Sequence, residues 1–329
     1  MTHRACIDIG GTKIAVSIAP SGQDRPIARQ TAPTIKSGKH PVLAQQILQL
    51  LDLACREAQV PPDAVTTAGV SSCGPFVADT QGRIELAAPN ICGGLSPRPG
   101  GPANDWTRIP LQAPLASRFA RLRIENDCIA ALEAERRWGA LRGLEHCAYV
   151  TWSTGIGMGL CVDGRALRGK NGNAGHGGHM IVSDDPDAEQ AALCGCGNRG
   201  DVEALTSGSH FAAVSGMDAP TLAQQALAGD GLARQHIERM CVILGRAIYN
   251  TVTTLDLQRV AMGGSVFWGL ADLALPLLRR EIEGRIPALT VGCSLVPAGL
   301  GRDVADWGAL ALATLAVDPL ACGPADHAR

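Results

Sequence analysis

The sequence predicts one structural unit twice: a strand, a short turn rich in glycine, and a returning strand. The first copy spans residues 5–18 around the turn GGTK at 10–13, and the second spans residues 147–162 around STGIG at 153–157. Two strands joined by such a turn form a β-hairpin. Two copies of one hairpin, each followed by a helical region, predict a duplicated α/β architecture with a cleft between two halves.

The glycine turns can be interpreted as phosphate sites or as plain turns. The first is not a Walker A loop, because that motif needs a strand, G-x-x-x-x-G-K-[ST] and then a helix. As a phosphate site, it would offer main-chain amides to phosphate oxygens, with Asp8 at the strand end near a metal ion. As a plain hairpin, it would leave Asp8 to pack against the turn. The repetition of the turn suggests a nucleotide phosphate chain held from both sides.

A third glycine turn, GGS at 263–265, lies between a predicted strand at 259–262 and a predicted helix at 268–283. A strand, a glycine turn and a helix together let a ligand approach the main chain closely at a helix N-terminus. This arrangement suits contact with an adenosine or a phosphate group.

The stretch 152–203 gathers residues that could bind a metal ion. His176 and His179 lie three apart, so they would share one face of a helix or of a tight turn. Cys194 and Cys196 follow closely enough to form one site with His179. Alternatively, the histidines are ordinary surface or core residues and the cysteines are buried thiols. The crowding of these residue types favours the metal site.

Asn126 and Asp127 follow a predicted strand at 121–125 and precede a predicted helix at 130–138. Asn or Asp at such a junction is most often a helix N-cap. The alternative is that Asp127 is a catalytic carboxylate. Position alone leaves both interpretations open.

Composition excludes several classes of protein. The chain has 329 residues, enough for two domains, and its net charge of −2 argues against a protein that coats nucleic acid or an anionic membrane. No uninterrupted apolar run approaches the ~18 residues of a membrane span. We see no secretory leader, and most of the 12 cysteines lie in apolar contexts, so we expect reduced thiols in a cytoplasmic protein.

Taken together, the motifs resemble those of the ROK family of sugar kinases, which share the actin-like, hexokinase-type ATPase fold. DIGGTK at 8–13 is similar to the family's first phosphate motif, STGIG at 153–157 to the second, and MGGSV at 262–266 to the adenosine motif. GKNGNAGHGGHM at 169–180 and CGCGNRGDVEA at 194–204 resemble its two signature stretches. The resemblance runs from about residue 6 to residue 314.

The resemblance implies a role for each matched residue. Asp127 would be the general base that takes the proton from the sugar hydroxyl, and Asp8 would bind Mg²⁺, through water. The residues implied to contact the sugar are Gly74, Asn90, Asn126, Asp127, His176, His179 and Glu203. The residues implied to bind ATP are Asp8, Gly10, Gly11, Thr12, Lys13, Thr154, Gly155, Gly263 and Gly264.

The sequence departs from the family pattern at two positions. His176 stands where the pattern Glu-x-x-His has glutamate, which bears on sugar specificity. Asp201 stands where the metal loop C-x-C-G-x-x-G-C-x-E has its third cysteine. We expect one structural Zn²⁺ bound by His179, Cys194, Cys196 and Asp201, since these are all accepted zinc ligands. The rival interpretation is that Asp201 caps a helix starting near Val202.

We therefore expect an ATP-dependent hexose kinase that phosphorylates glucose to glucose 6-phosphate. The alternatives are an N-acetylhexosamine kinase, acting on N-acetylmannosamine or N-acetylglucosamine, and a sugar sensor without catalysis; polyphosphate could replace ATP. Only four residues precede the first predicted strand, so we do not expect a DNA-binding repressor. We expect a homodimer, and partners limited to the sugar and ATP.

The predicted domain organisation has two lobes and a tail. A small lobe at 1–123 is completed by a C-terminal helix at 304–317 that packs back on it. A large lobe at 124–303 carries the metal loop, and a tail follows at 318–329.

Overall fold

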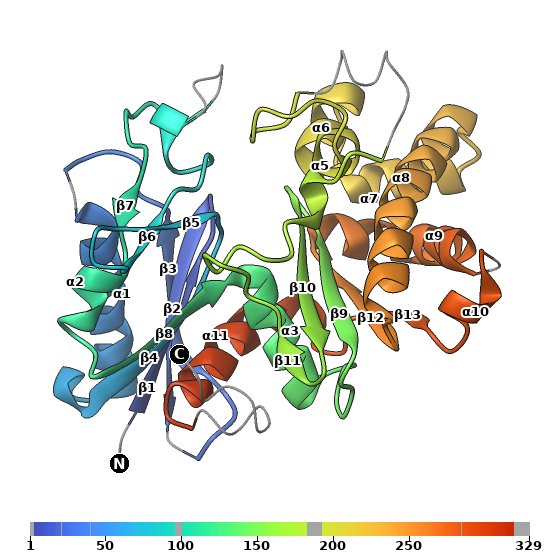
Figure 1. Cartoon of the computed structure of the whole chain (residues 1–329). Coiled ribbons are helices and arrows are strands. Elements are labelled where there is room, and N and C mark those ends of the chain that lie inside the picture. Colours follow the sequence, from blue (N-terminus) through green and yellow to red (C-terminus); the bar gives the residue numbers. More distant parts are fainter. Residues whose placement is uncertain are drawn as a thin grey trace. The chain divides into compact units, whose positions relative to one another are not determined.

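The structure is a computed structural model, which describes residues 3–20, 22–39, 41–95, 101–182, 193–283 and 285–318 (Figure 1). The chain divides into two compact units. The first comprises Met1–Ala134, Arg168–Ala174 and Asp303–Arg329, and the second comprises Glu135–Leu167 and Gly175–Arg302. No helix within the described ranges is both long and apolar enough to cross a membrane.

A five-stranded mixed sheet forms the centre of the first unit. Its order is β3 (Ile27–Pro33), β2 (Lys13–Pro20), β1 (His3–Ile9), β4 (Val65–Ser72) and β8 (Arg121–Asn126). The first three strands are antiparallel neighbours, whereas β4 and β8 run parallel to β1. Strands β1 and β2 are buried along most of their length, so the first hairpin belongs to the core of this unit.

Two long helices pack on this sheet (Figure 1). α1 (Val42–Ala58) contacts β2 and β3, and α11 (Val304–Leu315) contacts β1 and β4. Gly69 on β4 allows that second contact, because a Cβ there would collide with the main chain of α11. The chain therefore returns to the first unit after residue 302, and α11 packs there on the strands with which the unit begins.

Smaller elements complete the first unit. A three-stranded sheet contains β5 (Phe76–Ala78), β6 (Ile84–Leu86) and β7 (Ile109–Pro110), and α2 (Gln112–Ala116) contacts β6 and β8. The short 3₁₀ turns are η1 (Pro62–Ala64), η2 (Gly93–Leu95) and η4 (Gly301–Asp303).

The second unit also has a five-stranded mixed sheet. Its order is β11 (Arg165–Ala166), β10 (Ile156–Val162), β9 (Cys147–Trp152), β12 (Arg259–Gly263) and β13 (Ser294–Pro297). β10 is antiparallel to its neighbours, while β9, β12 and β13 are parallel to one another. The second predicted hairpin is therefore β9–β10.

Helices of the second unit pack against its sheet and against one another. They are α5 (Val202–Thr206), α6 (Gly208–Ser215), α7 (Ala219–Leu227), α8 (Gly231–Leu255), α9 (Ser265–Ile282) and α10 (Pro287–Thr290), with η3 (Gly177–His179) before them. α8 begins where Asp230 accepts main-chain hydrogen bonds from Leu232 and Ala233, as an N-cap does. Its apolar stripe packs on α9, which lies beside it (Figure 1).

The structure differs from the sequence expectations at three element boundaries. The predicted lobe boundary after residue 123 falls within β8, whose last residues pair with β4 up to Asn126. α3 (Asp127–Trp138) begins at residue 127 rather than 130, and Ala134 ends the first stretch of the first unit. α9 begins at Ser265 rather than at the predicted residue 268. The predicted tail lies outside the described residues, apart from Asp318.

Candidate active site

The first glycine turn lies between β1 and β2 and is closed by its own main chain. The N–H of Gly10 donates to the carbonyl of Lys13 at 2.9 Å, and the hydroxyl of Thr34 donates to the carbonyl of Gly10 at 2.7 Å. Thr12 and Lys13 are exposed. The turn therefore has a fixed shape while its outer residues remain accessible to a ligand.

Asn90 lies over this turn. Its amide occupies the space that a side chain at position 11 would need, because a Cβ on Gly11 would collide with the Asn90 side chain. A residue predicted to bind sugar thus touches a residue predicted to bind phosphate. Gly74 is also in the first unit, just beyond the end of β4, where the N–H of Cys73 donates to the carbonyl of Ile9.

Asp8 lies at the end of β1 and is largely buried. The pKa of its carboxyl is raised to about 6, mainly by burial and also by the nearby charge of Asp127, against a hydrogen bond from Ser71 that lowers it. The Ser71 hydroxyl donates to Oδ1 of Asp8 at 2.9 Å. The structure therefore brings two carboxylates of the predicted site, Asp8 and Asp127, within electrostatic reach of each other.

Asp127 is the first residue of α3, and the capping role there is shared. The N–H of Cys128 donates to Oδ1 of Asn126 at 2.9 Å and to Oδ1 of Asp127 at 2.8 Å. Asn126 is buried, whereas Asp127 is exposed. Surrounding protein atoms nevertheless raise the pKa of Asp127 above its ordinary value. Asp127 therefore accepts a hydrogen bond at the start of the helix while its carboxylate remains exposed.

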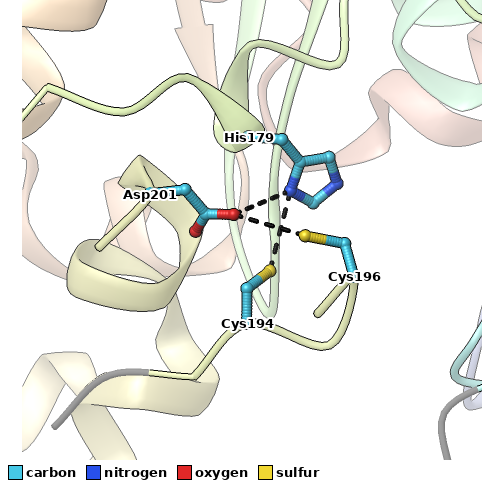
Figure 2. Close-up of side chains that lie close together, drawn as sticks. All are labelled: His179, Cys194, Cys196 and Asp201. Carbon is cyan, nitrogen blue, oxygen red and sulfur yellow. Dashed lines mark hydrogen bonds and ion pairs between the residues drawn. The ribbon is translucent and has the colours of Figure 1, made fainter. Parts of the chain in front are cut away.

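The four predicted zinc ligands converge in the second unit (Figure 2). Their ligand atoms all lie within 4.8 Å of one another. Nδ1 of His179 is 3.2 Å from Oδ2 of Asp201 and 3.6 Å from Sγ of Cys194, and Sγ of Cys196 is 3.4 Å from the same carboxylate oxygen. Tetrahedral zinc with ordinary bond lengths separates its ligand atoms by about 3.3–3.8 Å. The donor set and its spacing therefore fit a zinc ion.

Asp201 joins this cluster while it also caps a helix. Its Oδ1 accepts the N–H of Ala204 at 2.7 Å, which makes it the N-cap of α5, and its Oδ2 faces His179 and Cys196. The two sequence interpretations of Asp201 are therefore compatible, because a carboxylate has two oxygens.

Glu203 follows in α5 and touches the second glycine turn. Its Oε2 accepts the N–H of Ile156 at 2.9 Å, and a Cβ on Gly155 would lie 2.6 Å from that oxygen. Glycine at position 155 thus leaves room for the carboxylate. Thr154, at the tip of the turn, is exposed.

The third glycine turn lies beside the second in the same unit. Gly264 has a φ of 97°, and a Cβ there would collide with the main chain of Trp152. The hydroxyls of Ser153 and Ser265 are 3.1 Å apart. A Cβ on Gly263 would collide with Tyr149. Within the second unit, the structure therefore brings the phosphate turn at 153–157 beside the turn predicted to contact the adenosine.

His176 stacks on His179, with ring centroids 5.8 Å apart and planes at 11°. Its Nε2 is buried and has no hydrogen-bond partner in the described part of the chain. Burial lowers the pKa of His176, and the neighbouring His179 lowers it further, so the ring is neutral at pH 7. A buried ring nitrogen without a partner is costly unless a ligand satisfies it.

Two contacts of the segment 168–174, which belongs to the first unit, were not predicted from the sequence. Arg168 donates to Oε1 of buried Glu125 at 2.7 Å, and Asn173 pairs with the main chain of Phe76. Asn173 lies within a recognised motif, but its partner is distant in sequence and no local pattern indicates it.

Known proteins resemble this chain in sequence. The model of the ROK family matches residues 4–315. The N-acetylmannosamine kinase of Haemophilus influenzae (strain PittGG) is 30% identical over 311 residues, 92% of each chain. That of Shigella boydii serotype 18 is 34% identical over 316 residues, 93% of this chain and 97% of that one.

A solved structure resembles the whole fold. The ROK hexokinase from Thermus thermophilus superposes with a TM-score of 0.73 at 29% identity, covering 97% of this chain and 100% of that one. The predicted α/β fold of the hexokinase type, with a mixed sheet in each of two units, is confirmed.

Proposed function

Because this chain belongs to the ROK family, we propose that it is a kinase that transfers a phosphoryl group from ATP to N-acetylmannosamine. The observation that carries this proposal is the identity of 30–34% with N-acetylmannosamine kinases over more than nine-tenths of the chain. That the chain is a carbohydrate kinase is shown by its family and its relatives. The expectation of glucose as the sugar is not supported by them, and the N-acetylhexosamine alternative takes its place.

The chain's own residues supply what phosphoryl transfer needs. In such reactions the protein mostly positions groups and neutralises charge. Asp127 accepts the proton of the attacking hydroxyl through its exposed carboxylate. Asp8 would hold Mg²⁺, which would supply charge neutralisation at the phosphates, and its position at the end of β1 next to the first glycine turn supports that role.

In this proposal the glycine turns bind ATP, and a separate set of residues binds the sugar. The turns at 10–13 and 153–157 offer main-chain amides to the phosphates, and the turn at 263–265 contacts the adenosine. Gly74, Asn90, Asn126, His179 and Glu203 are the proposed sugar contacts, together with His176. The unpartnered Nε2 of His176 supports its place in this set.

We further propose one structural Zn²⁺ held by His179, Cys194, Cys196 and Asp201. When bound, the ion would cross-link the metal loop to the turn η3 that carries His179. A carboxylate is a harder ligand than a thiolate, so we expect weaker binding than in a site with three cysteines. Elemental analysis of protein purified without chelator measures the zinc content. A zinc content near zero in folded, active protein would contradict the proposal.

A panel of sugars tests the proposed substrate. We expect release of ADP from ATP, measured with a coupled assay, to give the highest kcat/KM with N-acetylmannosamine, ahead of N-acetylglucosamine, glucose and mannose. A higher value with glucose would overturn the choice of sugar. Sugar binding without any ADP release, in titration calorimetry, would instead favour the sensor. Polyphosphate offered in place of ATP tests the donor, and sedimentation analysis tests the proposed homodimer.

A further inference from the structure

The helix α5 (Val202–Thr206) connects the metal cluster to the second glycine turn. It has five residues, too few for a helix to be stable by itself, so its shape depends on the contacts at its two ends. One end carries Asp201 and the other leads into Ser207. Both ends lie in the second unit, as do residues 152–156, 179 and 194–196.

The metal end of α5 is fixed by Asp201. Its Oδ1 accepts the N–H of Ala204, while its Oδ2 lies against His179 and Cys196. The side chain is fully buried, and its two oxygens belong to one planar carboxylate, so a movement of Oδ2 also moves Oδ1. Any shift of the ligands when a metal ion binds must therefore reach the first turn of α5.

The other contacts of α5 hold the hairpin β9–β10 at its turn. Oε2 of Glu203 accepts the N–H of Ile156 at 2.9 Å, at the end of the turn. The indole N–H of Trp152, just before the turn, donates to the carbonyl of Thr206 at 2.6 Å. Both flanks of the turn at 153–157 are thus bonded to one short helix.

The residues after α5 complete this attachment. The N–H of Gly208 donates to the carbonyl of Ser153 at 2.8 Å, and the hydroxyl of Ser209 donates to the carbonyl of Thr154 at 3.1 Å. A Cβ at position 208 would approach that Ser153 carbonyl to 2.9 Å, so glycine permits the contact. The carbonyls of Ser153 and Thr154 are thus held by the first residues of α6, which follows α5 directly.

We propose that α5 couples the metal cluster to the phosphate turn, with Glu203 as the positioning residue, so that metal binding strengthens nucleotide binding. The inference rests on the proposed use of a nucleotide by the turn at 153–157. Coupling free energies between sites usually change affinity by about 5- to 150-fold. Coupling is also reciprocal: the nucleotide must raise the affinity for zinc by the same factor.

The first experiment compares zinc-loaded protein with protein freed of zinc by a chelator that is then removed. Binding of a non-hydrolysable ATP analogue with Mg²⁺ is measured by titration calorimetry without sugar. We expect at least about fivefold weaker binding to the zinc-free protein. A buffered zinc titration, with and without the analogue, should show the same factor. Equal analogue affinity in folded protein of both forms would overturn the proposal.

Variants of Glu203 decide the question if the zinc-free protein does not fold. Glu203→Gln keeps an oxygen that can accept the Ile156 N–H, whereas Glu203→Ala removes it. In zinc-loaded protein, we expect Glu203→Ala to weaken analogue binding at least about fivefold and Glu203→Gln to restore it within about twofold. Because no sugar is present, the proposed sugar contact of Glu203 does not contribute. Wild-type affinity in Glu203→Ala would overturn the proposal.

Variants of Asp201 separate capping from metal binding. Asp201→Asn keeps an N-cap acceptor and loses the carboxylate ligand, while Asp201→Cys restores a three-cysteine set and loses the cap. We expect Asp201→Asn to bind the analogue weakly whether or not zinc is supplied. A zinc response of wild-type size in Asp201→Asn would contradict the role of the Asp201 carboxylate in the coupling. Failure of zinc-loaded wild type to bind the analogue at all would overturn the proposed function itself, and this inference with it.

Discussion

Asn173 is joined to the main chain of Phe76 by two hydrogen bonds of 2.7 Å, one accepted from its N–H and one donated to its carbonyl. The two residues are 97 positions apart. This pairing attaches the segment 168–174 to β5, inside the first unit. Gly74, a proposed sugar contact of the same unit, lies two residues before Phe76.

We expect Asn173→Ala to lower the free energy of unfolding by about 1–3 kcal/mol, because two main-chain groups of Phe76 lose their partners. Urea unfolding measures this loss, and the KM for sugar should rise in the same variant. Asn173→Asp is the matched control, since it keeps the acceptor and removes only the donor, so its loss should be smaller. Unchanged stability of Asn173→Ala would show that the pair contributes little.

Asp127→Asn separates the base from the helix cap. Asparagine caps a helix as well as aspartate does, so we expect unchanged unfolding free energy and unchanged sugar affinity. The loss of a general base should lower kcat by about 10²–10⁴-fold. Stopped assays of ADP formation and titration calorimetry with the sugar measure the two quantities. Near-normal turnover would leave Asp127 as a cap alone.

His176→Glu tests whether the histidine that replaces the family's glutamate affects sugar specificity. Glutamate only accepts hydrogen bonds, whereas neutral histidine offers one donor and one acceptor. We expect the ratio of kcat/KM between N-acetylmannosamine and glucose to change at least about tenfold. His176→Gln retains a donor and an acceptor and should stay closer to the wild type. The same ratio in all three proteins would make His176 a bystander.

The raised pKa of Asp8 predicts a pH dependence for Mg²⁺. The folded value of about 6 lies above the ordinary value of 3.8, so below pH 6 a proton occupies the carboxyl and competes with the metal ion. We expect the Mg²⁺ concentration for half-maximal rate to rise as pH falls through 6, approaching about tenfold per pH unit. Initial rates at fixed ATP and sugar measure this.

The same shift has a consequence for stability without Mg²⁺. The folded protein binds this proton more tightly than the unfolded chain, so the contribution of Asp8 is most favourable below about pH 4 and is lost as pH rises through 6. Asp8→Asn removes the titration. A wild-type minus variant difference in unfolding free energy that does not change between pH 4 and 7 would contradict the shifted pKa.

The sequence alone determined the elements and the chemistry that they carry. Two kinds of local pattern were enough, because each depends on residues close along the chain. One is the set of glycine turns, at 10–13, 153–157 and 263–265, and the other is the spacing of His179, Cys194, Cys196 and Asp201. The same is true of the family resemblance, which the match over residues 4–315 confirms.

Only the tertiary structure decided how these parts meet. It showed that Asp201 both caps α5 and faces the metal ligands, since its two oxygens point to different partners. It placed Asn173 against Phe76 and Glu203 against Ile156, and it left Nε2 of His176 buried without a partner among the described residues. Such contacts depend on packing between segments distant in sequence, and local periodicity carries no information about which of them will meet.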